Sequence, residues 1–281
     1  MPGTLFLVST PIGNLDDITL RAVNTLRQVA VIACEDTRHS RKLLDHLGIS
    51  TPLLSCHEHN EANRSQQLIE RMINGDSVAL ISDAGTPLVS DPGFRLVEAA
   101  LATSILVVPI PGPSAALAAL SASGLPTDAF RFAGFLPAKR TQRRKALELL
   151  VEVEETTIFY EAPHRILEAL TDIEQVLGPD RPIVVAREIT KLHEEFLRGT
   201  VSHVHKLLAQ RAAVKGEITL IIGKIGKLAK RTPPLEEPGL VAEVDQLLAT
   251  GMPRMDAIKE VARRHNLGKR EVYTYIIESG G

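Results

Sequence analysis

The chain has 281 residues, of which 44% are hydrophobic and 23% charged, a composition typical of a globular protein with room for two domains and a small appendage. Its formal net charge of −2 excludes a strong overall positive field, so any surface for nucleic acid must be local. We find no secretion-type leader pattern and no apolar run of membrane-spanning length, and we therefore expect a protein without a membrane segment. Cys34 and Cys56 lack metal-type spacing, and two free thiols suggest a reducing compartment, so we expect a cytoplasmic protein.

Over roughly the first hundred residues, short apolar runs alternate with amphipathic helical patterns. Strands are expected at 4–8, 29–33, 52–54, 78–81 and 105–108. Strands that alternate with helices of this length predict a parallel, doubly wound sheet, and hence an α/β fold.

The run 78–81 is followed by a polar loop that begins with Ser82-Asp-Ala-Gly-Thr-Pro87 and closes with Asp91-Pro92-Gly93, and that contains two carboxylates as well as Ser and Thr hydroxyls. Asp91 is expected to cap the next helix, with Pro92 at its first position. In open α/β sheets, small ligands bind at the carboxyl ends of strands, so this loop predicts a ligand site. The alternative is an ordinary strand–loop–helix joint.

The proline-rich stretch 109–113 marks a domain boundary, after which Ser114 is expected to cap an alanine-rich helix at 115–121. Further strands are expected at 130–135, 156–160, 182–186 and 218–222, and helices at 143–152, 164–177 and 201–212. We therefore predict a two-domain arrangement, with an N-terminal α/β domain at 1–112 and a second α/β domain with a mixed sheet at 113–226.

After a charged, proline-containing linker, residues 236–281 carry apolar residues at helical spacing, with Leu267-Gly268 between the second and third expected helices. This arrangement is typical of a helix-turn-helix. The module is either a nucleic-acid-binding element or a solvated helical appendage.

Several familiar motifs are missing from the sequence. There is no Gly-x-Gly-x-x-Gly loop, no Walker lysine loop and no Gly-x-Ser-x-Gly elbow. His57-Glu58-His59 and His203-Val204-His205 lack a third ligand at a diagnostic spacing, so we expect no metal site.

A set of ordered segments nevertheless resembles one family, the bacterial ribosomal RNA small subunit methyltransferases I of the tetrapyrrole methylase superfamily. The similarity covers the whole chain, including the C-terminal helical module. The segments are Ser9-Thr10-Pro11-Ile12-Gly13-Asn14, Glu35-Asp36-Thr37-Arg38, Ser82-Asp-Ala-Gly-Thr-Pro87, Pro111-Gly-Pro-Ser114, Gly134-Phe-Leu-Pro137, Phe159-Tyr-Glu161, Ala186-Arg-Glu-Ile-Thr-Lys191 and Gly216-Glu217.

The resemblance implies a homodimer that uses S-adenosyl-L-methionine to methylate the ribose 2′-hydroxyl of a cytidine in small-subunit (16S) ribosomal RNA, as RNA or as the assembled 30S subunit. Here Gly85-Thr86-Pro87 stands where tetrapyrrole enzymes have glycine-Asp-proline, so Asp83 is expected to supply the carboxylate. The residues implied to line the cofactor are Pro11, Ile12, Asp83, Gly85, Thr86, Pro87, Val89, Ser114, Ala115, Phe135, Leu136, Glu217 and Ile218.

The chemistry of the implied reaction selects the other candidates. A sulfonium is already an activated methyl donor, so no metal is required, and a carboxylate or amine near the hydroxyl serves as base or orienter. Candidates for that role are Glu35, Asp36, Glu188 and Lys191, although Asp36 can equally cap a helix and form an ion pair. Candidates for RNA phosphates are Arg38, Arg140, Arg143, Arg144 and Arg187.

Two other functions remain open. A methyltransferase acting on a small tetrapyrrole would share the fold, although the basic segment 139–145 and the appended helices argue against it. A non-enzymatic RNA- or ribosome-binding protein would keep the C-terminal module but need no cofactor loop.

Overall fold

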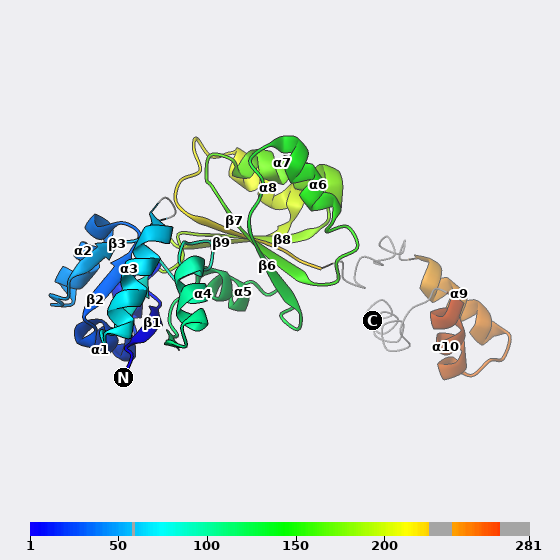
Figure 1. Ribbon diagram of the computed structural model, residues 1–281. Coiled ribbons are helices and arrows are strands. Elements are labelled where there is room, and N and C mark those ends of the chain that lie inside the picture. The colour runs from blue at the N-terminus through cyan, green and yellow to red at the C-terminus, as the bar shows by residue number, and fades with distance from the viewer. Residues whose placement is uncertain (58–59, 225–237, 265–281) are drawn as a thin grey trace. The chain divides into compact units, whose positions relative to one another are not determined.

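The computed structural model describes residues 1–57, 60–224 and 238–264, with the backbone alone for 238–242. The chain divides into two compact units, Met1–Ile225 and Gly226–Gly281 (Figure 1). All described strands lie in the first unit, where they form two separate five-stranded sheets. The sequence predicted a domain for each sheet, at 1–112 and 113–226; in the structure both sheets belong to one compact unit, and the boundary between the two domains stays a prediction.

The N-terminal sheet has the strand order β3-β2-β4-β1-β5, with every neighbouring pair parallel. The predicted parallel, doubly wound sheet is therefore confirmed, with strand ends shifted by a few residues. Its strands are β1 (Thr4–Val8), β2 (Val31–Cys34), β3 (Leu53–Ser55), β4 (Val78–Ile81) and β5 (Leu106–Ile110).

Helices cover both faces of this sheet because each parallel strand needs a crossover to reach the next. The helices α1 (Leu20–Gln28) and α2 (Thr37–His46), which follow the short 3₁₀ turn η1 (Leu15–Asp17), pack on one face in a core that includes Leu26 and Leu44. The helices α3 (Glu61–Ile73) and α4 (Phe94–Ala102) pack on the other. All four residues of β4 are consequently buried, as its unbroken apolar run predicts.

The second sheet has the order β6-β7-β10-β8-β9; β6 and β7 are parallel and the other pairs antiparallel, so the predicted mixed sheet is confirmed. Its strands are β6 (Phe130–Phe135), β7 (Thr156–Glu161), β8 (Pro182–Arg187), β9 (Glu195–Thr200) and β10 (Ile218–Ile222). Strand β9 was not predicted, because its sequence EFLRGT is polar and it pairs on one side only, with β8.

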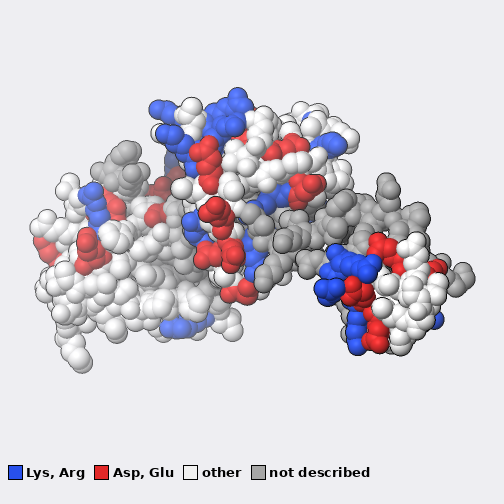
Figure 2. Space-filling model, turned by 90° about the vertical axis from the view of Figure 1, so that its right-hand side faces the viewer, with Lys and Arg blue, Asp and Glu red and all other residues white. Residues whose placement is uncertain are grey.

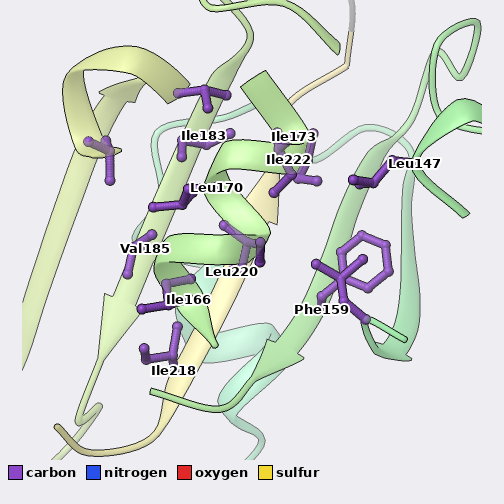
Figure 3. Packing of buried hydrophobic residues seen from close by; sticks show 14 of the residues in the cluster. Leu147, Phe159, Ile166, Leu170, Ile173, Ile183, Val185, Ile218, Leu220 and Ile222 are labelled. Atoms are coloured by element: carbon purple, nitrogen blue, oxygen red, sulfur yellow. The ribbon is translucent and has the colours of Figure 1, made fainter. Parts of the chain in front are cut away.

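Helices sandwich the second sheet as well. On one face lie α6 (Arg140–Glu148), α7 (Ile166–Leu177) and α8 (Val201–Ala209), and on the other α5 (Ala115–Ser121) (Figure 1). Figure 3 shows α7 over the sheet, with Ile166 and Leu170 in the same apolar layer as Leu220. Ser114 caps α5, as predicted, by accepting a hydrogen bond from the Leu117 N–H.

The start of α4 differs from the prediction that Asp91 caps it. The helix begins at Phe94, and its N-cap is Gly93. The buried Glu61 of α3 takes over the capping, since its Oε1 accepts hydrogen bonds from the N–H groups of Gly93 (3.1 Å) and Arg95 (2.9 Å). A tertiary contact thus replaces the local cap and leaves the Asp91 carboxylate available.

The second unit contains α9 (Pro238–Ala249) and α10 (Arg254–Arg264), which pack through Val244, Ile258 and Val261. The third helix expected in this module, with the Leu267-Gly268 turn before it, lies outside the described residues. Among the helices that the structure does describe, none is long and apolar enough to span a bilayer.

Candidate functional site

Two loops at the carboxyl ends of neighbouring parallel strands are clasped together. Thr10, after β1, exchanges two backbone hydrogen bonds with Gly85, after β4, at 2.9 and 3.0 Å. The Thr86 hydroxyl adds a bond to the Pro113 carbonyl at 3.3 Å, which joins the loop after β5. Gly85 has φ +80°, a conformation that favours glycine. The predicted ligand loop is therefore hydrogen-bonded to the loops after β1 and β5.

A cavity of about 370 Å³ opens at this edge, within the first unit. Its walls come from the loops after β1, β4 and β5 and from the ends of β6, β7, β8 and β10. This volume is in the range of small-molecule and cofactor sites. The lining residues are Ile12, Asp83, Ala84, Gly85, Thr86, Val89, Ser90, Asp91, Ser114, Ala115, Phe135, Tyr160, Glu161, Ala162, Pro163, Ile189, Glu217, Ile218 and Thr219.

Three of the residues expected to line the cofactor do not line this cavity. Leu136 is 1% exposed and packs in the core between the second sheet and its helices, because the chain turns inward after Phe135. Pro11 and Pro87 are buried within the clasped loops. The other ten expected residues all lie in the lining.

The second sheet contributes lining residues that sequence reasoning missed, above all Tyr160, Glu161 and Ile189. The segment Phe159-Tyr-Glu161 stood out as a motif, but nothing local in it indicates a cavity. Only the arrangement of β7, β8 and β10 in one mixed sheet brings it opposite the β4 loop. Asp91 counted among the carboxylates of the predicted ligand loop but not among the residues expected at the cofactor, because its sequence context favoured a helix cap.

The cavity is acidic. Among the lining residues there is no Lys, Arg or His, whereas Asp83, Asp91, Glu161 and Glu217 all contribute. Glu161 is paired with Arg165 at 2.7 Å and Glu217 with Lys191 at 2.9 Å. Asp83 and Asp91 have no Lys or Arg partner in the described part of the chain. Burial, reinforced by the nearby negative charge of Glu35, raises the pKa of Asp91 to about 6. Such a site favours a cationic ligand.

Glu188, Lys191 and Glu217 form a compact ion cluster beside the cavity. Lys191 Nζ lies 2.9 Å from both Glu188 Oε1 and Glu217 Oε2. Burial lowers the pKa of Lys191, but hydrogen bonds to Glu217 and Glu188 outweigh it and leave that pKa above its ordinary value. The Glu217 N–H and then Lys191 lower the pKa of Glu188. The two ion pairs and the raised pKa favour a protonated Lys191, so of the two roles predicted for it this geometry fits the orienter and not the base.

In the segment after β2, Asp36 caps a helix and forms an ion pair, which is the structural alternative to a catalytic role. Asp36 caps α2 by accepting from the Arg38 N–H, and its carboxylate also pairs with the Arg38 guanidinium at 3.3 Å. The hydrogen bond from the Arg38 side chain, followed by the one from the Arg38 backbone N–H, lowers the pKa of Asp36. The backbone N–H of Asp36 donates to Asp83 Oδ1 at 3.4 Å, which ties this segment to the cavity. Neither Glu35 nor Asp36 is part of the lining.

The arginines at the start of α6 gather around one buried carboxylate, that of Asp172 on α7. Arg143 is 1% exposed and lies 2.8 Å from Asp172, which corrects the expectation that Arg143 holds RNA phosphates. Arg140 pairs with the same carboxylate at 3.0 Å but keeps 62% of its side chain exposed, and Arg144 keeps 37%. Figure 2 shows Lys and Arg side chains gathered at the top of the larger unit, with acidic side chains close by.

Arg187 is also engaged inside the fold. Its Nε lies 3.1 Å from Glu195, and its Nη1 donates to the Lys215 carbonyl at 3.1 Å. Arg38, by contrast, has a side chain that is 90% exposed. Of the arginines expected to contact RNA, Arg38, Arg140 and Arg144 are therefore the accessible ones.

A two-sheet α/β fold with an acidic cavity at the strand ends is typical of an enzyme that binds a cationic small molecule, and comparison with known proteins identifies the family. Residues 4–205 match the family model of the Tetrapyrrole (Corrin/Porphyrin) Methylases, so the chain belongs to the tetrapyrrole methylase family. Enzymes of this family transfer a methyl group from S-adenosylmethionine, and the chain is accordingly a methyltransferase that uses this cofactor.

Within that family the chain belongs with proteins named ribosomal RNA small subunit methyltransferase I. It is 47% identical to the one from Halalkalibacterium halodurans over 96% of this chain and 93% of the relative. It is 46% identical to the one from Pseudomonas aeruginosa, over 99% of this chain and 98% of the relative. The match includes the C-terminal unit.

Solved structures share the fold at much lower identity. A cobalt precorrin-4 methyltransferase superposes with a TM-score of 0.59 at 18% identity, over 78% of this chain and 94% of that one. Uroporphyrin-III C-methyltransferase from Thermus thermophilus, in complex with S-adenosylhomocysteine, gives a TM-score of 0.55 at 19% identity, over 79% and 97% of the two chains.

Proposed function

We propose that this chain methylates the 2′-oxygen of a cytidine ribose in small-subunit (16S) ribosomal RNA, with S-adenosylmethionine as the methyl donor. The observation that carries the proposal is the 43–49% identity to ribosomal RNA small subunit methyltransferases over the methylase fold and the appended unit together. Matching only the catalytic fold would leave a tetrapyrrole substrate equally open.

The cavity fits the cofactor. Bound S-adenosylmethionine supplies a methyl group on a positively charged sulfur and carries an ammonium group, so it suits a cavity rich in carboxylates. Ile12, Val89 and Phe135 offer apolar surface, while Asp83 and Asp91 offer carboxylates that have no ion-pair partner among the described residues. A Cβ on Gly85 would lie 3.4 Å from Ile12 Cγ2, so the absent side chain keeps this wall open.

The chain's own residues have mainly a positioning task. They must hold the ribose hydroxyl in line with the methyl group and exclude water from the cavity. Glu188, Lys191 and Glu217 form a fixed polar cluster at one side of the cavity. We assign it the orientation of the ribose and its adjoining phosphate.

Contacts to the rest of the RNA fall to exposed cations. Arg140 and Arg144 lie on α6, which follows the cavity-lining Phe135, and Arg38 follows β2. These three arginine side chains face solvent, and arginine commonly contacts phosphate oxygens, so we assign them to the RNA backbone. The C-terminal unit adds Arg254, Lys259, Arg263 and Arg264 on or next to α10.

A homodimer is part of the proposal. Large apolar side chains are exposed on α4, β5 and α5, and a second copy could cover them. These are Phe94, Leu101, Leu106 and Leu117. Light scattering after size exclusion gives the mass of the particle in solution, and a mass of one chain would contradict the dimer.

Nucleoside mass spectrometry tests the activity. Ribosomal RNA from a strain lacking the gene should lose one 2′-O-methylcytidine, and the purified protein with S-adenosylmethionine should restore it. Naked 16S RNA and assembled 30S subunits, offered side by side, identify the substrate form. Retention of every 2′-O-methylcytidine in the deletion strain would contradict the proposal.

A further inference from the structure

The helices α6 and α7 lie side by side over the second sheet and enclose one carboxylate, that of Asp172 (Figure 1). Its Oδ2 lies 2.8 Å from the guanidinium of Arg143, and each of these two side chains is 1% exposed. Its Oδ1 lies 3.0 Å from Arg140 and 3.7 Å from Arg144. The exposed Glu168 also contacts Arg143, at 3.5 Å. Three guanidinium groups thus meet two carboxylates, so positive charge is left over on Arg140 and Arg144.

Gln175, one turn further along α7, holds the same two arginines together. Its Oε1 accepts hydrogen bonds from Arg140 Nη2 at 3.4 Å and from Arg144 Nη1 at 2.5 Å. The two guanidinium groups therefore share two acceptors and lie close to each other, although like charges repel. Because the amide of Gln175 supplies an acceptor without a negative charge, it fixes this arrangement and leaves the repulsion in place.

Both arginines keep hydrogen-bond donors for a further partner. The side chain of Arg140 is 62% exposed and that of Arg144 is 37% exposed. Within the described ranges, Nη1 of Arg140 and both Nε and Nη2 of Arg144 have no acceptor. A phosphate group fits this arrangement, since its oxygens accept several hydrogen bonds from guanidinium groups and its charge relieves their repulsion.

We propose that Gln175 and Asp172 are positioning residues that hold Arg140 and Arg144 as a clamp for one phosphate of the RNA backbone; this inference rests on the proposed function. The clamp is close to the cavity along the chain, because the lining residue Phe135 is five residues before Arg140. Five residues span at most about 18 Å. The clamped phosphate therefore lies within a few nucleotides of the target ribose.

The first experiment adds a negative charge to the clamp without removing a hydrogen bond. Gln175→Glu keeps the shape and the acceptor but neutralises one cation, so affinity for 16S RNA should fall about tenfold at about 0.1 M salt, the counterion contribution of one phosphate. The matched control is Gln67→Glu on α3, because the exposed Gln67 also accepts from an arginine, Arg64, at 2.8 Å. Filter binding measures both. Wild-type affinity in Gln175→Glu, or an equal loss in the control, overturns the proposal.

The second experiment asks whether the two arginines share one phosphate. Arg140→Ala, Arg144→Ala and the double variant are compared over a salt series. With one shared phosphate, the double variant should lower the slope of log affinity against log salt by about 1, and its loss of affinity should be smaller than the two single losses together. Additive losses with a slope lowered by about 2, or an unaltered slope, overturn the clamp. If an arginine variant fails to fold, Gln175→Glu, which removes no contact, decides.

The choice of probe separates RNA from a protein partner. Gln175→Glu should lose a similar factor on naked 16S RNA, on assembled 30S subunits and on an unrelated RNA of equal length, since phosphates carry no sequence information. A loss on 30S subunits alone indicates a ribosomal protein as the partner of the clamp. A loss on 16S RNA but not on the unrelated RNA indicates base recognition. Either result overturns the proposal.

The same variant separates this inference from the function beneath it. None of the four clamp residues lines the cavity, so Gln175→Glu should raise the Michaelis constant for RNA and leave S-adenosylmethionine affinity at the wild-type value. Cytidine methylation with an unchanged Michaelis constant contradicts the clamp and keeps the function. Weakened RNA binding in Gln175→Glu, with every 2′-O-methylcytidine retained in the deletion strain, does the reverse.

Discussion

Arg143 and Asp172 form an ion pair in which each side chain is 1% exposed and the two charged groups are 2.8 Å apart. This pair joins α6 to α7 over the second sheet. Burial by itself raises the pKa of Asp172, but hydrogen bonds from Arg140 and Arg143 outweigh it and keep the carboxylate ionised, with a pKa below its ordinary value.

Breaking this pair should be costly. Asp172→Asn leaves the buried Arg143 guanidinium with the exposed Glu168 carboxylate, at 3.5 Å, as its remaining countercharge, so we expect a loss of about 3–5 kcal/mol in the free energy of unfolding. Glu168→Gln is a matched control, because Glu168 contacts the same arginine from a side chain that is 72% exposed. Urea denaturation measures both. Equal effects would mean that the buried pair does not stabilise the fold.

The capping of α4 by Glu61 predicts a combined effect on stability and turnover. Glu61→Ala removes the acceptor of the Gly93 and Arg95 N–H groups, and a lost cap typically costs about 1–2 kcal/mol. Because the loop before α4, in which Leu88 and Ser90 have positive φ, then loosens at the cavity wall, the methylation rate should fall as well. Glu70→Ala, exposed on the same helix, is the control. A stable variant with full turnover would contradict the role of Glu61.

Gly85 tests the clasped loop. Its φ of +80° means that any side chain there strains the backbone, so even Gly85→Ala should destabilise the protein by about 1 kcal/mol. Gly48→Ala is a matched control, since Gly48 has φ +61° with nothing within 4 Å of a built Cβ. Both variants should lose similar stability in thermal denaturation, but only Gly85→Ala should weaken S-adenosylmethionine binding. Equal cofactor affinities would remove Gly85 from the site.

The exposed arginines of α6 predict a salt effect. Arg140→Ala with Arg144→Ala should weaken RNA binding and reduce the slope of log affinity against log salt by about 1 per lost contact. Arg71→Ala, whose side chain is 39% exposed on α3, is the control. Filter binding over a salt series measures the slope. An unaltered slope would assign the phosphate contacts to the C-terminal unit.

Asp91 predicts a stability change with a definite sign. Its pKa is raised from 3.8 to about 6 on folding, so the folded state binds more protons than the unfolded state between those values, and stability falls as pH rises through them. Asp91→Asn should therefore be more stable than the wild type above pH 6, on the order of 1–2 kcal/mol after solvent screening. Below pH 4 the two should coincide. A variant less stable at pH 7.5 in urea denaturation would contradict an ionised, unpaired Asp91.

The sequence by itself determined the elements and one side of the site. Unbroken apolar runs marked buried strands such as β4, because a strand covered on both faces needs no polar positions. Small residues, glycine and hydroxyls marked the loop from Ser82 to Thr86, whose conformation depends on local backbone freedom. Of the ten expected cofactor residues that line the cavity, Asp83, Gly85 and Thr86 lie in this loop, and the others were implied by the family resemblance.

Only the tertiary structure decided what the charged side chains do. A carboxylate or guanidinium has the same local signature whether it faces solvent, a ligand or a buried partner. The sequence predicted that Asp91 caps α4, but in the structure Glu61 of α3 accepts the hydrogen bonds at that helix end. It predicted that Arg143 contacts RNA, but Arg143 forms a buried ion pair with Asp172. Glu61 and Gly93 are 32 residues apart in the sequence, and Arg143 and Asp172 are 29 residues apart. Only the packing of the helices brings these partners within hydrogen-bond distance.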